Sequence, residues 1–140
     1  MKSLVVMLAA VAIFANGSEP TDYPTAFKRA QSGDKPLLVL VTADWCPPCQ
    51  QMKATTIPNL ISKNAFKDFH FATVDLGQEE KLARKLIGDR GIPQIILFEK
   101  GERRWEKRYL RGIQSTASVE AFIEKSQMRM RIAGKTTPSK

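Results

Sequence analysis

The chain contains two cysteines, Cys46 and Cys49, and only Pro47 and Pro48 separate them. Two thiols at this spacing can close into a small disulfide ring and open it again. A loop this short constrains the unfolded chain very little, so the disulfide adds little stability. The pair therefore indicates a reversible dithiol/disulfide centre, with an inert structural disulfide as the alternative.

The elements around the two cysteines predict different roles for them. Leu37 to Thr42 is an apolar run that predicts a buried strand, and Pro48 suits the first position of a helix directly after it. Cys46 then lies at the helix N-terminus, where free N–H groups and the helix dipole favour a thiolate. Cys49 lies one turn further in, shielded beneath Cys46. We expect Cys46 to be the nucleophile and Cys49 the resolving thiol.

The two prolines are expected to tune this centre. Pro47 and Pro48 have no N–H, which leaves the amide of Cys49 as the main local donor to the Cys46 sulfur. Fewer donors stabilise the thiolate less, and a less stable thiolate favours the disulfide form. We therefore expect a protein that reduces its partners rather than oxidising them.

The N-terminal residues 1–17 are predicted to be an export signal. Lys2 supplies a positive charge, residues 4–14 are apolar, and Ala15-Asn16-Gly17 offers small residues for cleavage. The apolar run is shorter than the roughly 20 residues that a membrane span needs. An uncleaved anchor or a core segment is the alternative. We predict an exported protein, periplasmic or secreted, with one domain at residues 18–127 and a basic, disordered tail at 128–140.

Charge and composition bear on ligands and partners. The formal net charge is +8, and the tail from Arg129 onwards contains no acidic residue. Such a tail can attract anionic lipid or an acidic partner, or it can simply be solvated. It has no aromatic residue for stacking on bases, so we expect no nucleic-acid partner.

His70 is the single histidine, and we expect neither metal nor cofactor. The alternative to an enzyme is a binding module, in which Met52 and the cysteines hold copper(I) or the domain holds client proteins without turnover.

Hydrophobic periodicity places the remaining elements. Helices are expected from Pro24 to about Gly33, after Pro48, and from Glu79 to Ile87 with Gly88 as the stop. Pro58 should kink or end the second of these, and Ser115 or Thr116 should cap a last helix. Strands are expected at residues 37–42, 69–75, 94–98 and 103–110, the last two as a hairpin. This order predicts an α/β fold with a mixed central sheet flanked by helices on both faces.

The segment from about Tyr23 to Gln127 resembles the thioredoxin family. Trp45-Cys46-Pro47-Pro48-Cys49 is similar to the active-site motif of that family, with Pro47 in place of its usual glycine. Gly91-Ile92-Pro93 is similar to its cis-proline loop, residues 97–102 to its hairpin, and Gly112 to its late glycine near the site.

The resemblance implies a thioredoxin-like fold and a thiol–disulfide oxidoreductase that exchanges disulfides with protein substrates. It implies a cis bond between Ile92 and Pro93. It also implies that Trp45, Ile92, Pro93 and Gly112 line the groove that receives the partner's chain. We expect a monomer without a bound cofactor, recharged by a membrane or exported redox partner.

The chain departs from the family beneath the site. Many thioredoxins bury an acid six positions before the first cysteine, and here that position is Leu40. The lysine that often accompanies the acid would fall at Phe71. Asp44 is close in sequence but is expected to point elsewhere. The usual base for deprotonating the resolving cysteine is therefore missing.

Overall fold

The computed structural model describes residues 19–33 and 35–136, so the predicted export signal lies outside the described residues. The first five elements are α1 (Tyr23–Ser32), β1 (Leu37–Thr42), α2 (Pro47–Gln51), the π-helical segment η1 (Met52–Thr56) and α3 (Ile57–Ser62). The other five are β2 (His70–Asp75), α4 (Glu80–Ile87), β3 (Gln94–Lys100), β4 (Trp105–Arg111) and α5 (Thr116–Thr136).

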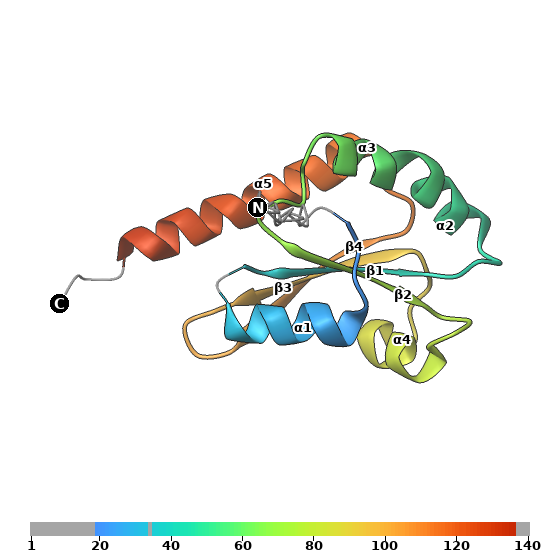
Figure 1. Ribbon diagram of the computed structural model, residues 1–140, viewed down its shortest axis with the longest axis horizontal. Coiled ribbons are helices and arrows are strands. Elements are labelled where there is room, and N and C mark those ends of the chain that lie inside the picture. Colours follow the sequence, from blue (N-terminus) through green and yellow to red (C-terminus); the bar gives the residue numbers. More distant parts are fainter. Residues whose placement is uncertain (1–18, 34, 137–140) are drawn as a thin grey trace, which may run out of the picture.

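The strands form one mixed sheet in the order β2-β1-β3-β4. β1 pairs with β2 in parallel, and β3 pairs antiparallel with both β1 and β4. α1 and α4 cover one face of the sheet, and α2, α3 and α5 cover the other (Figure 1). The predicted hairpin and the predicted α/β fold with helices on both faces are confirmed.

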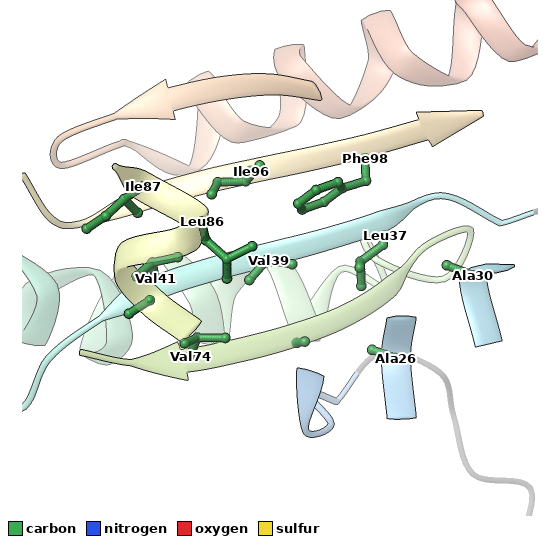
Figure 2. Packing of buried hydrophobic residues seen from close by; sticks show 12 residues of the cluster. Ala26, Ala30, Leu37, Val39, Val41, Val74, Leu86, Ile87, Ile96 and Phe98 are labelled. Carbon is green, nitrogen blue, oxygen red and sulfur yellow. The ribbon is translucent and has the colours of Figure 1, made fainter. Parts of the chain in front are cut away.

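β1 is buried along its whole length, because helices exclude water from both of its faces. Leu37, Val39 and Val41 contribute to the core beneath α1 and α4 (Figure 2). Leu38 and Leu40 alternate with them and contribute to the core beneath α3 and α5. Burying one such side chain contributes about 1.5–3 kcal/mol. The cysteine motif therefore follows a firmly anchored strand.

The helical segment after the cysteines continues through Pro58. Because Pro58 has no N–H, an α-helix cannot form its usual hydrogen bond at this position. The chain widens into the π-helical segment η1 just before the proline, and the Ile57 amide donates to the Met52 carbonyl. The interruption predicted at Pro58 is thus a change of helix type, after which α3 carries Ile57 and Leu60 into the core.

The helix ends follow local chemistry. The Asp22 side chain accepts a hydrogen bond from the Thr25 amide at 3.0 Å and caps α1. Gly88 ends α4 with a φ of 65°, as predicted from a residue without a Cβ. Ser115 Oγ accepts from the Ser118 amide at 3.1 Å, which confirms the predicted cap of the last helix.

The prediction of a disordered tail from residue 128 is wrong for residues 128–136, which continue α5. Arg129 in this stretch donates to the Glu99 carboxylate at 3.0 Å, and Gln127 just before it donates to Asp68 at 3.0 Å. These contacts hold the helix against the domain, and α5 extends past the sheet (Figure 1). None of the described helices is both long and apolar enough to cross a membrane.

Candidate active site

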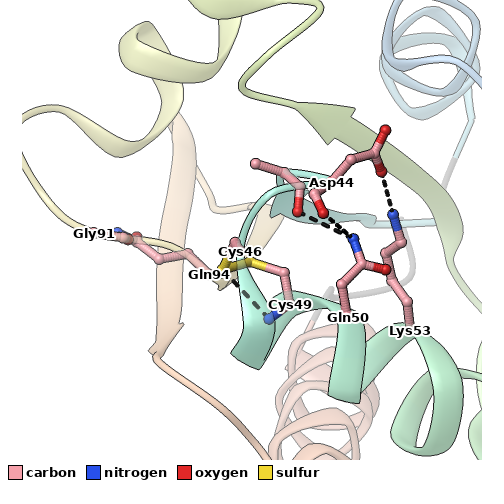
Figure 3. The surroundings of a disulfide bond; sticks show 8 residues. Asp44, Cys46, Cys49, Gln50, Lys53, Gly91 and Gln94 are labelled. Carbon is pink, nitrogen blue, oxygen red and sulfur yellow. Dashed lines mark hydrogen bonds and ion pairs between the residues drawn. A yellow bond between two sulfur atoms is a disulfide. The ribbon is translucent and has the colours of Figure 1, made fainter.

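The two cysteines lie just beyond the carboxyl end of β1 and form a disulfide bond (Figure 3). Cys46 is the N-cap of α2, with extended backbone angles of φ −100° and ψ 109°. Pro47 and Pro48 occupy the first two helical positions, where an N–H would have no intrahelical partner. The helix therefore begins at Pro47, one residue before the position predicted from Pro48, and Cys46 caps it as expected.

The two sulfur-bearing residues are unequally accessible. Cys46 is 5% exposed and Cys49 is 1% exposed. Ala43 is packed with them in one small cluster, and Leu76 and Ile92 contact that cluster from outside. Both residues are therefore buried in the disulfide form, with Cys46 slightly the more exposed, and the order of attack stays a prediction.

The Cys46 sulfur has few local donors. Within the described chain, its one hydrogen bond comes from the Cys49 amide, with 3.4 Å between nitrogen and sulfur. This contact is the one expected when Pro47 and Pro48 contribute no N–H. The Gln50 amide instead donates to the Cys46 carbonyl at 3.0 Å as part of the helix.

The loop before β3 packs against the disulfide. The Ile92–Pro93 peptide bond is cis, as the resemblance implies, and Ile92 contacts the cysteine cluster. Gly112 has a φ of 77°, and its amide donates to the Pro93 carbonyl at 2.9 Å. The structure thus brings Ile92, Pro93 and Gly112 together beside Cys46 and Cys49.

Gln94 supports this loop from below, although no sequence motif marks it. Its side chain is buried, with 1% exposed, and its Nε2 donates to the Gly91 carbonyl at 2.7 Å. This hydrogen bond closes the segment from Gly91 to Gln94 (Figure 3). A polar residue at the start of an otherwise apolar strand was the available signal, because buried amides normally have a hydrogen-bonding task.

Two large apolar side chains that neighbour site residues in the chain are open to solvent. Trp45 is 67% exposed and Ile113 is 48% exposed. A methyl group at Gly77 would lie 3.5 Å from Trp45 Nε1, so the indole rests beside that glycine. Ile113 directly follows Gly112, and no sequence motif marks it. Exposed apolar groups at a reactive site are typical of a surface that binds other chains.

Asp44 does not face the disulfide. Its carboxylate pairs with Lys53 at 3.0 Å, and its side chain is 67% exposed (Figure 3). Gln50 Nε2 donates to the Asp44 carbonyl at 2.8 Å and holds this turn. The expectation that Asp44 points elsewhere is therefore confirmed.

The layer beneath the site is apolar. Leu40 is 1% exposed and Phe71 is 2% exposed, and both belong to the core beneath α3 and α5. Among the described residues, the buried side-chain oxygens without a hydrogen-bond partner are Thr42 Oγ1 and Gln94 Oε1. Neither belongs to a group that ionises near neutral pH, so these residues supply no buried base.

The described residues contain no group of three or more His, Cys, Asp or Glu side chains that could hold a metal ion. The site consists of the disulfide at the N-terminus of α2, the exposed side chains of Trp45 and Ile113, and the cis-proline loop. Fold and site together define a thiol–disulfide oxidoreductase.

Comparisons with known proteins agree. The family model described as Thioredoxin matches residues 11–125. A thioredoxin of Rickettsia felis is 31% identical over 99 residues, which cover 71% of this chain and 89% of that protein. Among solved structures, a thioredoxin from Thermus thermophilus superposes with a TM-score of 0.65 at 24% identity, covering 81% of this chain and 89% of the other. A Schistosoma mansoni thioredoxin gives 0.59 at 27% identity, with 79% and 97% covered.

The chain therefore belongs to the thioredoxin family. Its fold is the thioredoxin-like α/β fold.

Proposed function

We propose that this protein is an exported reductase of protein disulfides. In the reduced enzyme, the Cys46 thiolate attacks one sulfur of the client disulfide, a mixed disulfide forms, and the first client thiolate leaves. The Cys49 thiolate then attacks Cys46 Sγ and releases the second client thiolate. Two electrons pass from the enzyme dithiol to the client, and the enzyme ends as the Cys46–Cys49 disulfide found in the structure.

The hydrogen bonding of Cys46 supports the proposal that the protein reduces its clients. One amide donor, that of Cys49, contacts the Cys46 sulfur, because Pro47 and Pro48 have none to give. Each additional N–H donor would stabilise the thiolate and make the enzyme a stronger oxidant. A thiolate with a single donor loses less on forming a disulfide, so the dithiol gives up its electrons more readily.

The surface beside the disulfide would bind the client. Trp45 and Ile113 supply exposed apolar area, and the backbone of Ile92 lies next to the cysteine cluster. The resemblance to thioredoxins supports Trp45, Ile92, Pro93 and Gly112 as the groove, and the contact between Gly112 and Pro93 supports grouping them. An extended client segment beside Ile92 would place its disulfide over Cys46.

Export rests on the sequence. Residues 1–17 have the charge and apolar pattern of a signal peptide. An exported reductase needs a membrane or exported partner to return electrons to the disulfide, because an oxidising compartment does not supply them.

The reduction potential of the cysteine pair tests the direction. Equilibration in dithiothreitol or glutathione buffers should give a value of about −270 mV, as in thioredoxin-like reductants. A value of about −120 mV would make the protein an oxidant and refute the argument from the prolines. The substitution Pro47→Gly restores one backbone N–H and should raise the reduction potential of the cysteine pair. Such a rise would identify the missing amide as the cause of the low potential.

The order of attack is tested by trapping. Cys49→Ser should accumulate a mixed disulfide between Cys46 and a client protein, visible by non-reducing electrophoresis and mass spectrometry. Cys46→Ser should trap nothing. Trapping through Cys49 instead would reverse the assigned roles.

A further inference from the structure

A hollow lies at the end of the sheet opposite the disulfide. It has a volume of about 730 Å³ and lies between the turn from β3 to β4 and the last turns of α5. The hairpin turn and the end of α5 lie at one end of the molecule, and α2 lies at the other (Figure 1). The extension of α5 supplies one wall, with Arg129, Met130 and Ala133. Its volume is in the range of small-molecule sites.

The floor of the hollow contains a buried carboxylate that holds two arginines. Glu99 is 7% exposed. Its carboxylate accepts from Arg108 Nε at 2.9 Å, from Arg129 Nη2 at 3.0 Å and from the Ser126 hydroxyl. Burial alone would raise the pKa of Glu99, but the hydrogen bonds from Ser126 and Arg108 and the charge of Arg129 outweigh it and lower that pKa. Glu99 therefore stays ionised and keeps both guanidinium groups in place.

The fixed arginines retain unused donors. A guanidinium has five N–H groups. Arg129 uses Nε and Nη2 on Glu99, and Arg108 uses Nε on Glu99 and Nη2 on Glu106. Their side chains are 37% and 40% exposed, so solvent and ligands reach them. Arginines that are already ordered lose little entropy when they bind an anion.

Further positive charge surrounds these two groups. Arg103 and Arg104 line the hollow from the hairpin turn, and both are exposed. Neither forms an ion pair or a side-chain hydrogen bond with the residues that the structure describes. The lining holds five basic and three acidic side chains, which leaves a formal excess of two positive charges.

We propose that this hollow binds the phosphate group of an organic ligand, either a soluble phosphorylated metabolite or a phospholipid headgroup. A guanidinium group matches the geometry of phosphate and can donate two parallel N–H hydrogen bonds to two of its oxygens. Met130 and Ala133 give the non-phosphate part of the ligand an apolar wall. The site is independent of the cysteine chemistry, because it lies at the other end of the sheet.

Nuclear magnetic resonance titration of the whole oxidised protein tests the site. The probes are glycerol 3-phosphate, and vesicles of phosphatidylglycerol and phosphatidylcholine in equal parts compared with pure phosphatidylcholine vesicles. Saturable shifts of the hairpin and Arg129 resonances with glycerol 3-phosphate would identify a soluble ligand. Binding to the anionic vesicles alone would identify a headgroup.

Two variants separate a built site from general attraction. Arg103→Ala with Arg104→Ala should weaken binding about tenfold, because two charge-assisted donors are lost. Arg129→Lys keeps the charge but not the fork, and should weaken it about threefold or more. The control, Lys81→Ala with Lys85→Ala on α4, removes the same charge far from the hollow and should change binding by less than about twofold.

The proposal is overturned if neither probe binds, or if the α4 control weakens binding as much as the hairpin variant. Reduction of an insulin disulfide should be the same in all of these variants. A failure of the site would therefore leave the proposed reductase unaffected, and a failure of the reductase would leave the phosphate site standing.

Discussion

The two ends of the sheet use opposite chemistry. At the disulfide end, Cys46 and Cys49 pack among apolar side chains, position 40 carries a buried leucine, and one amide hydrogen bond reaches the Cys46 sulfur. At the hairpin end, a buried carboxylate holds guanidinium groups from β4 and α5. One end keeps fixed charge away from a group that must change its redox state, and the other uses fixed charge to attach a helix. A single fold supports both because β1 and β3 separate them.

The largest effect is expected when charge is introduced at the apolar end. Leu40→Asp should lower the free energy of unfolding by about 4 kcal/mol, because it removes a buried apolar side chain and buries a carboxyl group. It should also speed the release of the client from the mixed disulfide, since the new carboxylate can accept the Cys49 proton. Urea unfolding and stopped-flow thiol exchange measure the two effects.

Leu40→Asn is the matched control. It should be destabilised to a similar degree without the gain in exchange rate, because an amide does not take up the proton. Equal exchange rates in the two variants would show that the apolar layer does not limit the resolving step.

Removing the buried charge at the hairpin end should lower the free energy of unfolding by about 2 kcal/mol. Glu99→Gln leaves Arg129 without its carboxylate and leaves Arg108 with Glu106 alone. The partial exposure of both arginines reduces the cost below that of a fully buried pair. Because the pKa of Glu99 is lowered in the fold, its contribution is present above the unfolded glutamate pKa of about 4.3 and is lost as the pH falls from there. Unfolding curves at neutral and acidic pH measure this.

The stability difference between the wild-type protein and Glu99→Gln should therefore shrink below about pH 4.3. A difference that stayed constant through this range would mean that the carboxylate charge is not what holds α5. Glu106→Gln, whose side chain is 51% exposed, is the control and should change stability by less than about 0.5 kcal/mol.

A smaller effect is expected from the loop beside the disulfide. Gln94→Met keeps the length of the side chain but removes the hydrogen bond to the Gly91 carbonyl. The lost hydrogen bond contributes roughly 1 kcal/mol to holding the loop in position. Its loss should raise KM for a protein client about fivefold and leave the reduction potential unchanged. Gln50→Met removes a comparable bond to Asp44 on the other side of the site and should leave KM unchanged. A shift in potential with Gln94→Met would contradict a purely positioning role.

The smallest effect is a gain in stability. Thr42→Val replaces a buried hydroxyl that has no hydrogen-bond partner among the described residues, and should stabilise the fold by about 0.5–1 kcal/mol. Thr56→Val removes a buried hydroxyl that donates to the Gln114 carbonyl at 2.9 Å, and should destabilise it by about 1 kcal/mol. Thermal unfolding of the pair measures the contrast. A loss of stability in both would show that the Thr42 hydroxyl is satisfied in solution.

Local pattern carried much of the prediction. The apolar run at residues 37–42 and the turn at Gly88 predicted elements that the structure contains. The spacing of Cys46 and Cys49 and the two prolines between them predicted the single amide donor. These features depend on neighbours within a few residues, so the order of residues is enough to reveal them.

Other features depend on partners that are distant in sequence. Residues 128–136 carry mostly basic and apolar side chains, a composition that fits a solvated tail equally well. Their helical state depends on Arg129 reaching Glu99, which lies 30 positions earlier. The role of Gln94 likewise depends on its burial beneath the loop.

The sequence by itself determined the redox pair, the order of the elements, and the absence of an acid at Leu40, because each is a matter of residue type and spacing. The tertiary structure alone decided that Gln94 supports the loop, that Asp44 turns toward Lys53, and that α5 continues along the hairpin. Those outcomes depend on which side chains the sheet and its helices bring within hydrogen-bonding distance, and chain order does not specify that distance.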